Sequence, residues 1–229
     1  MWRAEPAKIW FIIKPNVSLE KRLRAAEEYL KAHDAKLAPI IERYKPWRLS
    51  PHSDHYGELV SSMVGQQLSV KAAASIWRRV LALFEGRMPT PEQLLAADSE
   101  KLRACGVSYA KISYMKDLAQ HIIDGKLDMA HIASLPDEEL TKQLTAVKGI
   151  GEWSAHMFMI FSLGRLDILP VGDLGVRRAA MLLYDLAELP DKPTLEKLAR
   201  KNHWNPYESV AAWYLWQSLN NAPKETRHS

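Results

Sequence analysis

The succession of helix signals along the chain constrains its fold more than any other feature. Apolar residues recur at helical spacing, as in Val70, Trp77 and Phe84, while the alternation typical of strands is nearly absent. Thr90-Pro91-Glu92-Gln93 has the form of a capping box with proline at the first helical position. The pattern predicts an all-α fold with helices at 18–33, 56–65, 70–84, 92–97, 99–104, 108–124, 137–146, 152–163, 173–186, 194–202 and 206–220.

Composition narrows the class of protein further. With 229 residues, of which 47% are hydrophobic and 25% charged, the chain has ordinary globular values. The net charge of +4 fits a nucleic-acid partner but is too small to indicate one. The single Cys105 excludes a disulfide framework and an all-cysteine iron–sulfur or zinc site within one chain. Because no apolar run reaches the roughly 18 residues of a membrane span, we expect a soluble intracellular protein without membrane contact.

Residues 144–155, Leu-Thr-Ala-Val-Lys-Gly-Ile-Gly-Glu-Trp-Ser-Ala, are typical of a helix, a tight turn and a second helix. Gly149 and Gly151 allow the positive φ and the close approach that such a turn needs. The amides that open a helix have no partner within it, so they can bind an anion such as a phosphate. About twenty residues later, a Pro-x-Gly turn presents the carboxylate of Asp173. Together the two segments predict a phosphate-binding hairpin with an acid held nearby.

Three blocks of the sequence resemble one protein family: residues 63–73, residues 144–178 and residues 204–216. With them the chain resembles the helix-hairpin-helix DNA glycosylases, and within these the 3-methyladenine DNA glycosylase II branch, which removes alkylated bases. The resemblance implies two helical lobes with the active-site cleft between them. It implies one lobe from residues 18–68 with 169–222, a central lobe from 69–168 that contains the hairpin, and an N-terminal extension at 1–17.

The resemblance also implies an activity. A monomer would flip alkylated purines of the 3-methyladenine and 7-methylguanine type out of double-stranded DNA, hydrolyse their N-glycosidic bond and leave an abasic site. No cofactor would be required, and the enzyme would act at the bacterial nucleoid, or in the nucleus of a eukaryote. Two alternatives stay open: a non-catalytic helix-hairpin-helix DNA-binding module, and a sister glycosylase for oxidised or mismatched bases.

Asp173 is the candidate catalytic residue. Cleaving a base from deoxyribose develops positive charge on the sugar, which a fixed carboxylate stabilises while it orients or deprotonates the attacking water. A base alkylated on a ring nitrogen is already cationic, so it can leave without a general acid. Asp173 can instead cap the helix that follows it, and the two roles are compatible.

By the resemblance, Trp153 and Trp216 form aromatic walls of the pocket for the flipped base. Electron-rich rings attract cationic purines through cation–π interaction. Met157 stands at a pocket position that is aromatic in well-known relatives. Trp153 also occupies the position where lyase-type relatives carry a Schiff-base lysine, and an indole cannot form an imine. The resemblance therefore implies a monofunctional glycosylase, although an ordinary core role stays open for Trp153.

The remaining site predictions concern DNA contacts and a cation. Gln67 takes the position of the side chain that fills the duplex after base extrusion, with Leu68 as the alternative and Gln66 beside them; solvated turn residues remain the other interpretation. The resemblance places further DNA contacts on the hairpin, at Lys148, Gly149, Ile150 and Gly151. It also implies a sodium or potassium ion on the backbone carbonyls of Thr145, Val147 and Gly149.

Two further local predictions can be checked against the structure. Asn205-Pro206-x-Glu208 has the form of a capping box, so Glu208 is expected to be structural. His52 and His55 are expected to be solvated loop residues.

Overall fold

The computed structural model describes residues 17–219, and all regular structure in this range is helical. The predicted all-α class is confirmed, and no helix in this range is long and apolar enough to cross a membrane. The predicted extension at 1–17, apart from residue 17, lies outside the described residues. The helices are α1 (Val17–His33), α2 (Ala38–Tyr44), α3 (His55–Gly65), α4 (Val70–Ala82), α5 (Pro91–Ala96), α6 (Ser99–Ala104), α7 (Tyr109–Ile123), η1 (Ile132–Ser134), α8 (Asp137–Thr145), α9 (Glu152–Met157), η2 (Phe158–Ser162), α10 (Leu174–Leu183), α11 (Lys192–Lys201) and α12 (Glu208–Leu219).

Most predicted helices are present, and the differences have local causes. The short helices α2 and η1 were not predicted, because each is too short to show a full apolar stripe. The predicted helix at 152–163 is α9 followed by the π-helical turn η2. In that turn the N–H of Leu163 donates to the carbonyl of Phe158 at 3.2 Å, five residues earlier.

The described chain divides into two compact units, whose boundaries differ from the predicted ones. One unit holds residues 52–151, and the other holds residues 17–51 together with 152–219. The predicted boundaries at 68 and 168 are therefore replaced by boundaries at 51 and 151. Helix α3 belongs with the central segment because it packs against α4 and α7. The predicted cleft between two lobes stays a prediction.

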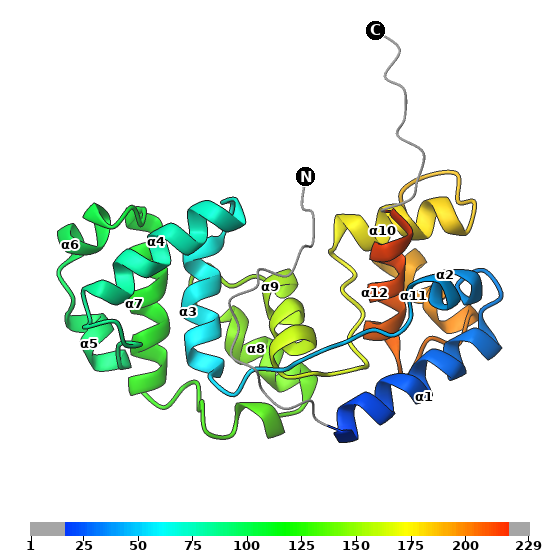
Figure 1. The fold of residues 1–229 in the computed structure, drawn as a ribbon, viewed down its shortest axis with the longest axis horizontal. Coiled ribbons are helices and arrows are strands. Elements are labelled where there is room, and N and C mark those ends of the chain that lie inside the picture. Colours follow the sequence, from blue (N-terminus) through cyan, green and yellow to red (C-terminus); the bar gives the residue numbers. More distant parts are fainter. Residues whose placement is uncertain (1–16, 220–229) are drawn as a thin grey trace, which may run out of the picture. The chain divides into compact units, whose positions relative to one another are not determined.

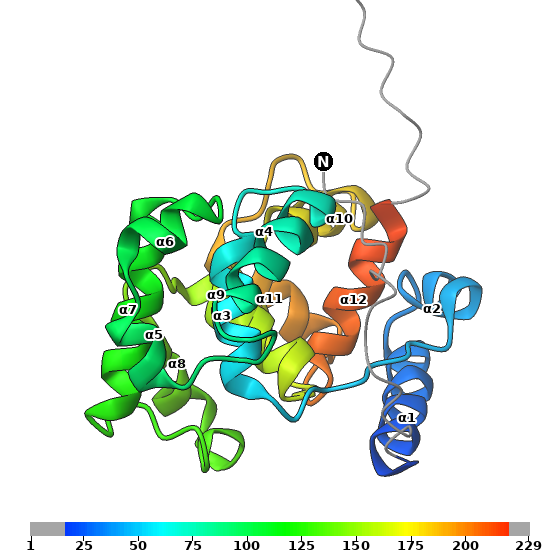
Figure 2. The same ribbon diagram turned by 60° about the vertical axis from the view of Figure 1, so that its left-hand side comes forward.

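Helix α7 organises the unit of residues 52–151. It packs against α3, α5 and α6 (Figure 1, Figure 2), and its Met115 and Leu118 are fully buried. At the start of α5, the predicted capping box is confirmed: the N–H of Thr90 donates to Gln93 Oε1 at 2.9 Å, and the N–H of Gln93 donates to Thr90 Oγ1 at 3.3 Å. Local capping thus fixes a short helix against the central one.

Two buried carboxylates join the N-terminal and C-terminal parts of the other unit. Asp34 Oδ2 accepts the indole N–H of Trp204 at 2.7 Å, and Glu27 Oε1 accepts the hydroxyl of Tyr214 at 2.8 Å. All four side chains are buried, and buried polar groups must be hydrogen-bonded. Around them α12 packs against α1, α2 and α10 (Figure 1, Figure 2). Residues more than 150 positions apart therefore share one core.

The start of α12 differs from the prediction. The amide of Asn205 donates from Nδ2 to Asp167 Oδ2 at 2.7 Å, and the helix begins three residues later at Glu208. The N–H of Ser209 donates to the carbonyl of Leu166 at 2.9 Å. The predicted capping box at Asn205 is therefore wrong, because residues 166–167, distant in the sequence, accept the first amides of α12. The same contacts anchor the chain shortly before the turn that carries Asp173.

Candidate functional site

The turn at residues 170–173 places Asp173 at the start of α10. The N–H of Asp173 donates to the carbonyl of Pro170 at 2.9 Å, which closes the turn. Asp173 Oδ1 then accepts the N–H of Val176 at 2.8 Å, so Asp173 is the N-cap of α10. The predicted capping role is confirmed. It fixes the side chain in one orientation relative to the helix.

Two indole groups share the carboxylate of Asp173. Trp216 of α12 donates from Nε1 to Oδ1 at 2.8 Å, and Trp153 of α9 donates from Nε1 to Oδ2 at 2.7 Å. The structure thus brings together the predicted acid and both predicted pocket tryptophans within one unit. With Val176, three N–H groups hold the carboxylate. Hydrogen bonds to an ionised acceptor are among the stronger ones in proteins, so the group is well oriented.

Aromatic side chains continue from Trp216 to Phe161, which the sequence analysis missed. The ring of Phe161 stacks on Trp216 with 5.9 Å between centroids and an interplanar angle of 26°. Phe161 also forms a T-shaped pair with Trp47, with 6.4 Å between ring centroids. The residues Trp153, Met157 and Phe161 follow one another at intervals of four, and this helical spacing is the signal that could have identified Phe161.

The exposure of these residues is compatible with a base-binding surface. Trp153 is 45% exposed and Phe161 is 36% exposed, although both are large apolar side chains. Met157, the third predicted pocket residue beside the two tryptophans, is half-buried at the end of α9. Solvent-accessible aromatic surface beside an acid provides both a stacking partner and a charged group. The core alternative for Trp153 is wrong, since nearly half of its surface is accessible.

The two hairpin glycines differ in whether the structure requires glycine at their position. Gly149 has a φ of +81°, and a Cβ there would lie 2.3 Å from Tyr114 Cδ2, so this position requires glycine. Gly151 has no positive φ, contrary to the prediction, and a Cβ there would meet no described atom within 4 Å. No described group accepts the N–H of Gly149 or Gly151. Ile150 is buried, and its N–H donates to the carbonyl of Val147 at 3.1 Å.

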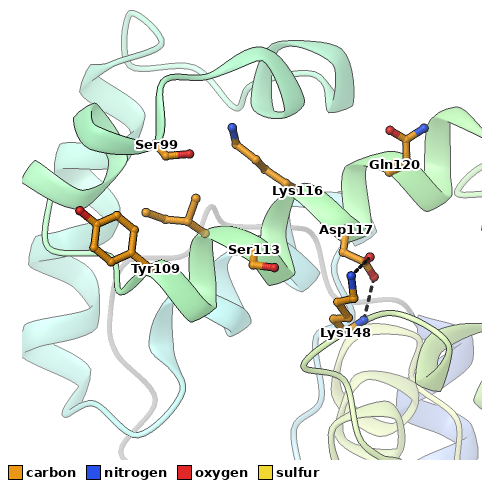
Figure 3. Close-up of a pocket in the computed structure, with 8 residues that line it drawn as sticks. Ser99, Tyr109, Ser113, Lys116, Asp117, Gln120 and Lys148 are labelled. Atoms are coloured by element: carbon orange, nitrogen blue, oxygen red, sulfur yellow. Dashed lines mark hydrogen bonds and ion pairs between the residues drawn. The ribbon is translucent and has the colours of Figure 1, made fainter.

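Lys148 is held by an acid on α7. Its backbone N–H donates to Asp117 Oδ2 at 2.9 Å, and its Nζ lies 3.3 Å from Asp117 Oδ1 (Figure 3). Burial alone would raise the pKa of Asp117, but the hydrogen bonds from Lys148 outweigh it and the pKa is lowered. The positive charge of Lys148 is thus partly compensated within the protein, which weakens its predicted contact with phosphate.

A polar pocket borders this ion pair. Its volume is about 440 Å³, and Ser113, Lys116 and Gln120 of α7 contribute to its lining together with Lys148. Figure 3 shows these side chains around the hollow, with Asp117 turned toward Lys148. Because the lining is polar and its acid is already paired, this hollow differs from the predicted base pocket, whose residues lie beyond position 151.

One face of α7 holds two loops together. Lys111 Nζ donates to the carbonyls of Val64 at 2.8 Å and Gln66 at 2.6 Å, at the end of α3. Gln66 Nε2 in turn donates to the carbonyl of Gly149 at 2.9 Å. Burial lowers the pKa of Lys111, which has carbonyls as its partners here. The loop after α3 and the hairpin are therefore linked through Gln66.

The sequence analysis missed this arrangement. Lys111, Tyr114 and Asp117 follow one another at intervals of three on α7, and each contacts one of the two loops. The spacing was visible in the sequence, but an ordinary polar helix face shows the same pattern.

The three residues after α3 differ from one another in how exposed their side chains are. Gln67 is exposed and has a φ of +59°, a conformation that is uncommon for a residue other than glycine. Gln66 and Leu68 are half-buried, and the N–H of Leu68 donates to the carbonyl of Gly65 at 3.1 Å. Of the three, Gln67 is the side chain whose exposure suits insertion into a duplex.

The carbonyls predicted to bind a cation are partly engaged. The carbonyl of Val147 accepts the N–H of Ile150, and the carbonyl of Gly149 accepts Gln66 Nε2. A carbonyl oxygen has two lone pairs, so both groups retain one acceptor position, and together with Thr145 they are compatible with a cation. A sodium or potassium ion at these three carbonyls stays a prediction.

The histidines near α3 are less exposed than predicted. His52 and His55 are half-buried, and His52 Nδ1 lies 4.0 Å from Glu58 Oε1. Burial lowers the pKa of His55. Within residues 17–219, no group of three or more histidine, cysteine or acidic side chains could hold a metal ion.

Comparisons with known proteins agree with this arrangement. Residues 60–205 match the family described as HhH-GPD superfamily base excision DNA repair protein. DNA-3-methyladenine glycosylase 1 of Schizosaccharomyces pombe is 36% identical over 201 residues, which cover 86% of this chain and 87% of the relative.

Solved structures give the same result. The chain is similar to a DNA-3-methyladenine glycosidase from Bacillus halodurans, with a TM-score of 0.78, 41% identity, and coverage of 86% of this chain and 89% of the other. It is also similar to a 3-methyladenine DNA glycosylase of Schizosaccharomyces pombe in complex with abasic DNA, with a TM-score of 0.71, 36% identity, and coverage of 86% and 98%.

The family match spans more than half of the chain, and these relatives match most of it. The resemblance inferred from the three sequence blocks is thereby confirmed. The chain belongs to the HhH-GPD superfamily of base excision DNA repair proteins, among relatives named 3-methyladenine DNA glycosylases.

Proposed function

We propose that this protein is a DNA glycosylase that hydrolyses the N-glycosidic bond of alkylated purines. The observation that carries the proposal is the carboxylate of Asp173, held by three N–H groups beside exposed aromatic rings. Departure of the base leaves positive charge on the deoxyribose, and the carboxylate stabilises that charge and orients the water that attacks the sugar. A purine methylated at a ring nitrogen is cationic and leaves without protonation. One acid is therefore sufficient for this substrate class.

The aromatic side chains account for recognition of the base. A flipped purine can stack on the accessible ring of Trp153 and on the Trp216–Phe161 pair. A cationic base over an indole face gains about 0.5–2 kcal/mol, depending on how far it is desolvated. Damaged bases of this type are thus favoured over neutral ones.

The unit of residues 52–151 supplies the contacts with DNA in this proposal. The amides of Gly149 and Gly151 would bind backbone phosphates, and Gln67 would fill the space left by the flipped base. A cation at the hairpin carbonyls would add positive charge near the same phosphates. The partner is double-stranded DNA with alkylated bases. The protein would act at the nucleoid of a bacterium or in the nucleus of a eukaryote.

The enzyme would be monofunctional. An indole stands at position 153, and Lys148 is paired with Asp117, so neither provides a free amine for attack on the sugar. We therefore expect neither strand cleavage without added alkali nor a covalent complex trapped by borohydride during turnover. A trapped adduct that mapped to Lys148 would contradict the assignment.

The decisive experiment is base release from DNA treated with a methylating agent, resolved by chromatography. We expect 3-methyladenine and 7-methylguanine among the released bases. A protein that binds this DNA but releases no base would be a non-catalytic hairpin module. Release from oxidised or mismatched DNA, but not from methylated DNA, would identify a sister glycosylase instead.

A further inference from the structure

We propose that Gly175 and Trp216 together position Asp173. Because Gly175 has no side chain, the indole edge of Trp216 can approach the carboxylate of Asp173 and hold it in place. The inference rests on the proposed glycosylase activity, because it concerns how the same acid is oriented. It assigns a role to Gly175, which no sequence pattern suggested.

The space at Gly175 is the first observation. Gly175 lies in the first turn of α10 and has no positive φ, so the backbone itself does not require glycine there. A Cβ at this position would lie 3.0 Å from Asp173 Oδ1, 3.0 Å from Trp216 Cδ1 and 3.1 Å from Trp216 Nε1. Such contacts are tighter than ordinary van der Waals separations. The groups that would have to move are the two partners of the 2.8 Å hydrogen bond from Trp216 to Asp173.

A ring face of Trp216 is also occupied. Phe161 stacks on the indole ring, and Phe161 and Trp47 form a T-shaped pair. Trp47 in turn stacks on Trp213 with 5.4 Å between ring centroids. Because close-packed rings resist displacement, an indole pushed away from position 175 has little room to rotate. The hydrogen bond to Asp173 would lengthen or break instead.

The pair also distinguishes the two oxygens of Asp173. Oδ1 accepts two N–H groups, one from Val176 and one from Trp216. Oδ2 accepts one N–H, from the half-exposed Trp153. A carboxylate has about four acceptor positions, two on each oxygen, so Oδ2 retains one for a water or for the sugar. We therefore assign Oδ2 as the oxygen that acts on the substrate and Oδ1 as the oxygen that anchors the side chain.

The test compares Gly175→Ala, Trp216→Phe and the double variant with the unchanged protein. Trp216→Phe keeps an aromatic ring but removes the N–H, whereas Gly175→Ala keeps the N–H but displaces it. We expect each single change to slow single-turnover release of 3-methyladenine by about tenfold to a hundredfold, because small misplacements of a catalytic group are costly. Affinity for undamaged duplex DNA, which has no flipped cationic base, should stay unchanged. The double variant should be no slower than the slower single variant, since both changes remove the same hydrogen bond.

Leu182→Ala is the matched control. Leu182 lies on the same helix, α10, about two turns after Gly175, and its side chain is exposed. This variant should release base at the unchanged rate. Gly175→Ala should still unfold cooperatively in a thermal scan, because the helix preference of alanine offsets part of the strain of displacing the indole.

Two results would overturn the inference. One is a Gly175→Ala variant with the unchanged rate, and the other is a double variant whose loss is the product of the single losses. Exchange of the Trp216 indole N–H, followed by NMR, gives a readout independent of activity. Faster exchange in Gly175→Ala supports the pair even if the protein releases no methylated base, a result that would contradict the proposed function alone. Unchanged exchange would refute the pair.

Discussion

At the scale of single residues, Asp173 has a structural task, to which the proposed function adds a chemical one. Its Oδ1 caps α10 through Val176, while the indoles of α9 and α12 bind the same carboxylate. Three helices thus converge on one side chain. Capping holds the acid at a fixed place, and the acid in turn satisfies two indole N–H groups that would otherwise need other partners.

The two tasks can be separated by Asp173→Asn. Asparagine is as good an N-cap as aspartate, so α10 should stay intact. The negative charge proposed to stabilise the sugar is lost, however, and one N–H donor would face an amide NH₂ group. We expect single-turnover base release to fall by about a hundredfold or more. The measurement is base release by chromatography, with DNA affinity and thermal unfolding as controls. A variant that released base at near-normal rates would show that Asp173 is only a cap.

At the scale of elements, the hairpin between α8 and α9 contains two glycines with different constraints. Gly149→Ala should destabilise the fold by about 1–3 kcal/mol, because a positive φ and the ring of Tyr114 both oppose a Cβ. Gly151→Val should leave the fold intact, because a Cβ at this position would meet no described atom within 4 Å.

Gly151→Val should nevertheless weaken binding to all duplex sequences alike. A side chain at this position would stand between the hairpin amides and a phosphate, and phosphate contacts carry no base information. Affinity for several unrelated duplexes, measured beside thermal unfolding, tests both expectations. If folded Gly151→Val bound DNA like the unchanged protein, the hairpin would not be the phosphate site.

The first residue of α12, Glu208, has a carboxyl group whose pKa is raised. Burial, together with the nearby carboxylates of Asp167 and Glu196, raises the pKa of Glu208 to about 7 against the opposing effect of Arg200. The folded state therefore binds this proton more tightly than the unfolded chain, whose pKa is near 4.5. Stability from Glu208 is fully present below pH 4.5 and is lost as the pH rises through about 7.

Glu208→Gln should remove this dependence of folding stability on pH. Glutamine is neutral at every pH, so the variant should be more stable than the unchanged protein at pH 8, by on the order of 1 kcal/mol after solvent screening of this half-buried position. Below pH 4.5 the two proteins should unfold alike. Denaturant titrations between pH 4 and 8 provide the measurement. Parallel pH profiles for the two proteins would mean that Glu208 titrates normally.

At the scale of the whole molecule, the exposed apolar residues indicate the expected oligomeric state. Large exposed apolar side chains of the described range are spread over several helices, among them Val70 of α4, Tyr109 of α7 and Leu182 of α10. Scattered residues of this kind are normal on a monomer surface, whereas a stable dimer needs a continuous apolar patch. We expect sedimentation equilibrium to give the monomer mass of 26.1 kDa at micromolar concentration. A mass near twice that value would show self-association.

The local part of this protein could be predicted from the sequence alone. Helix positions, the capping box at Thr90 and the capping role of Asp173 depend on residues within one or two turns of each other. The three sequence blocks also indicated the family. They indicated Asp173 and its two tryptophans as well, and these three side chains lie together in the structure.

Only the tertiary structure decided the features that depend on distant partners. The expected cap at Asn205 is replaced by contacts with residues 166–167, and the hairpin is tied to α3 through Gln66. The need for glycine at position 175 exists because Trp216, 41 positions away, approaches Asp173 there. Packing and hydrogen bonding between segments that meet only in the folded chain set these contacts, and local sequence preferences do not specify them.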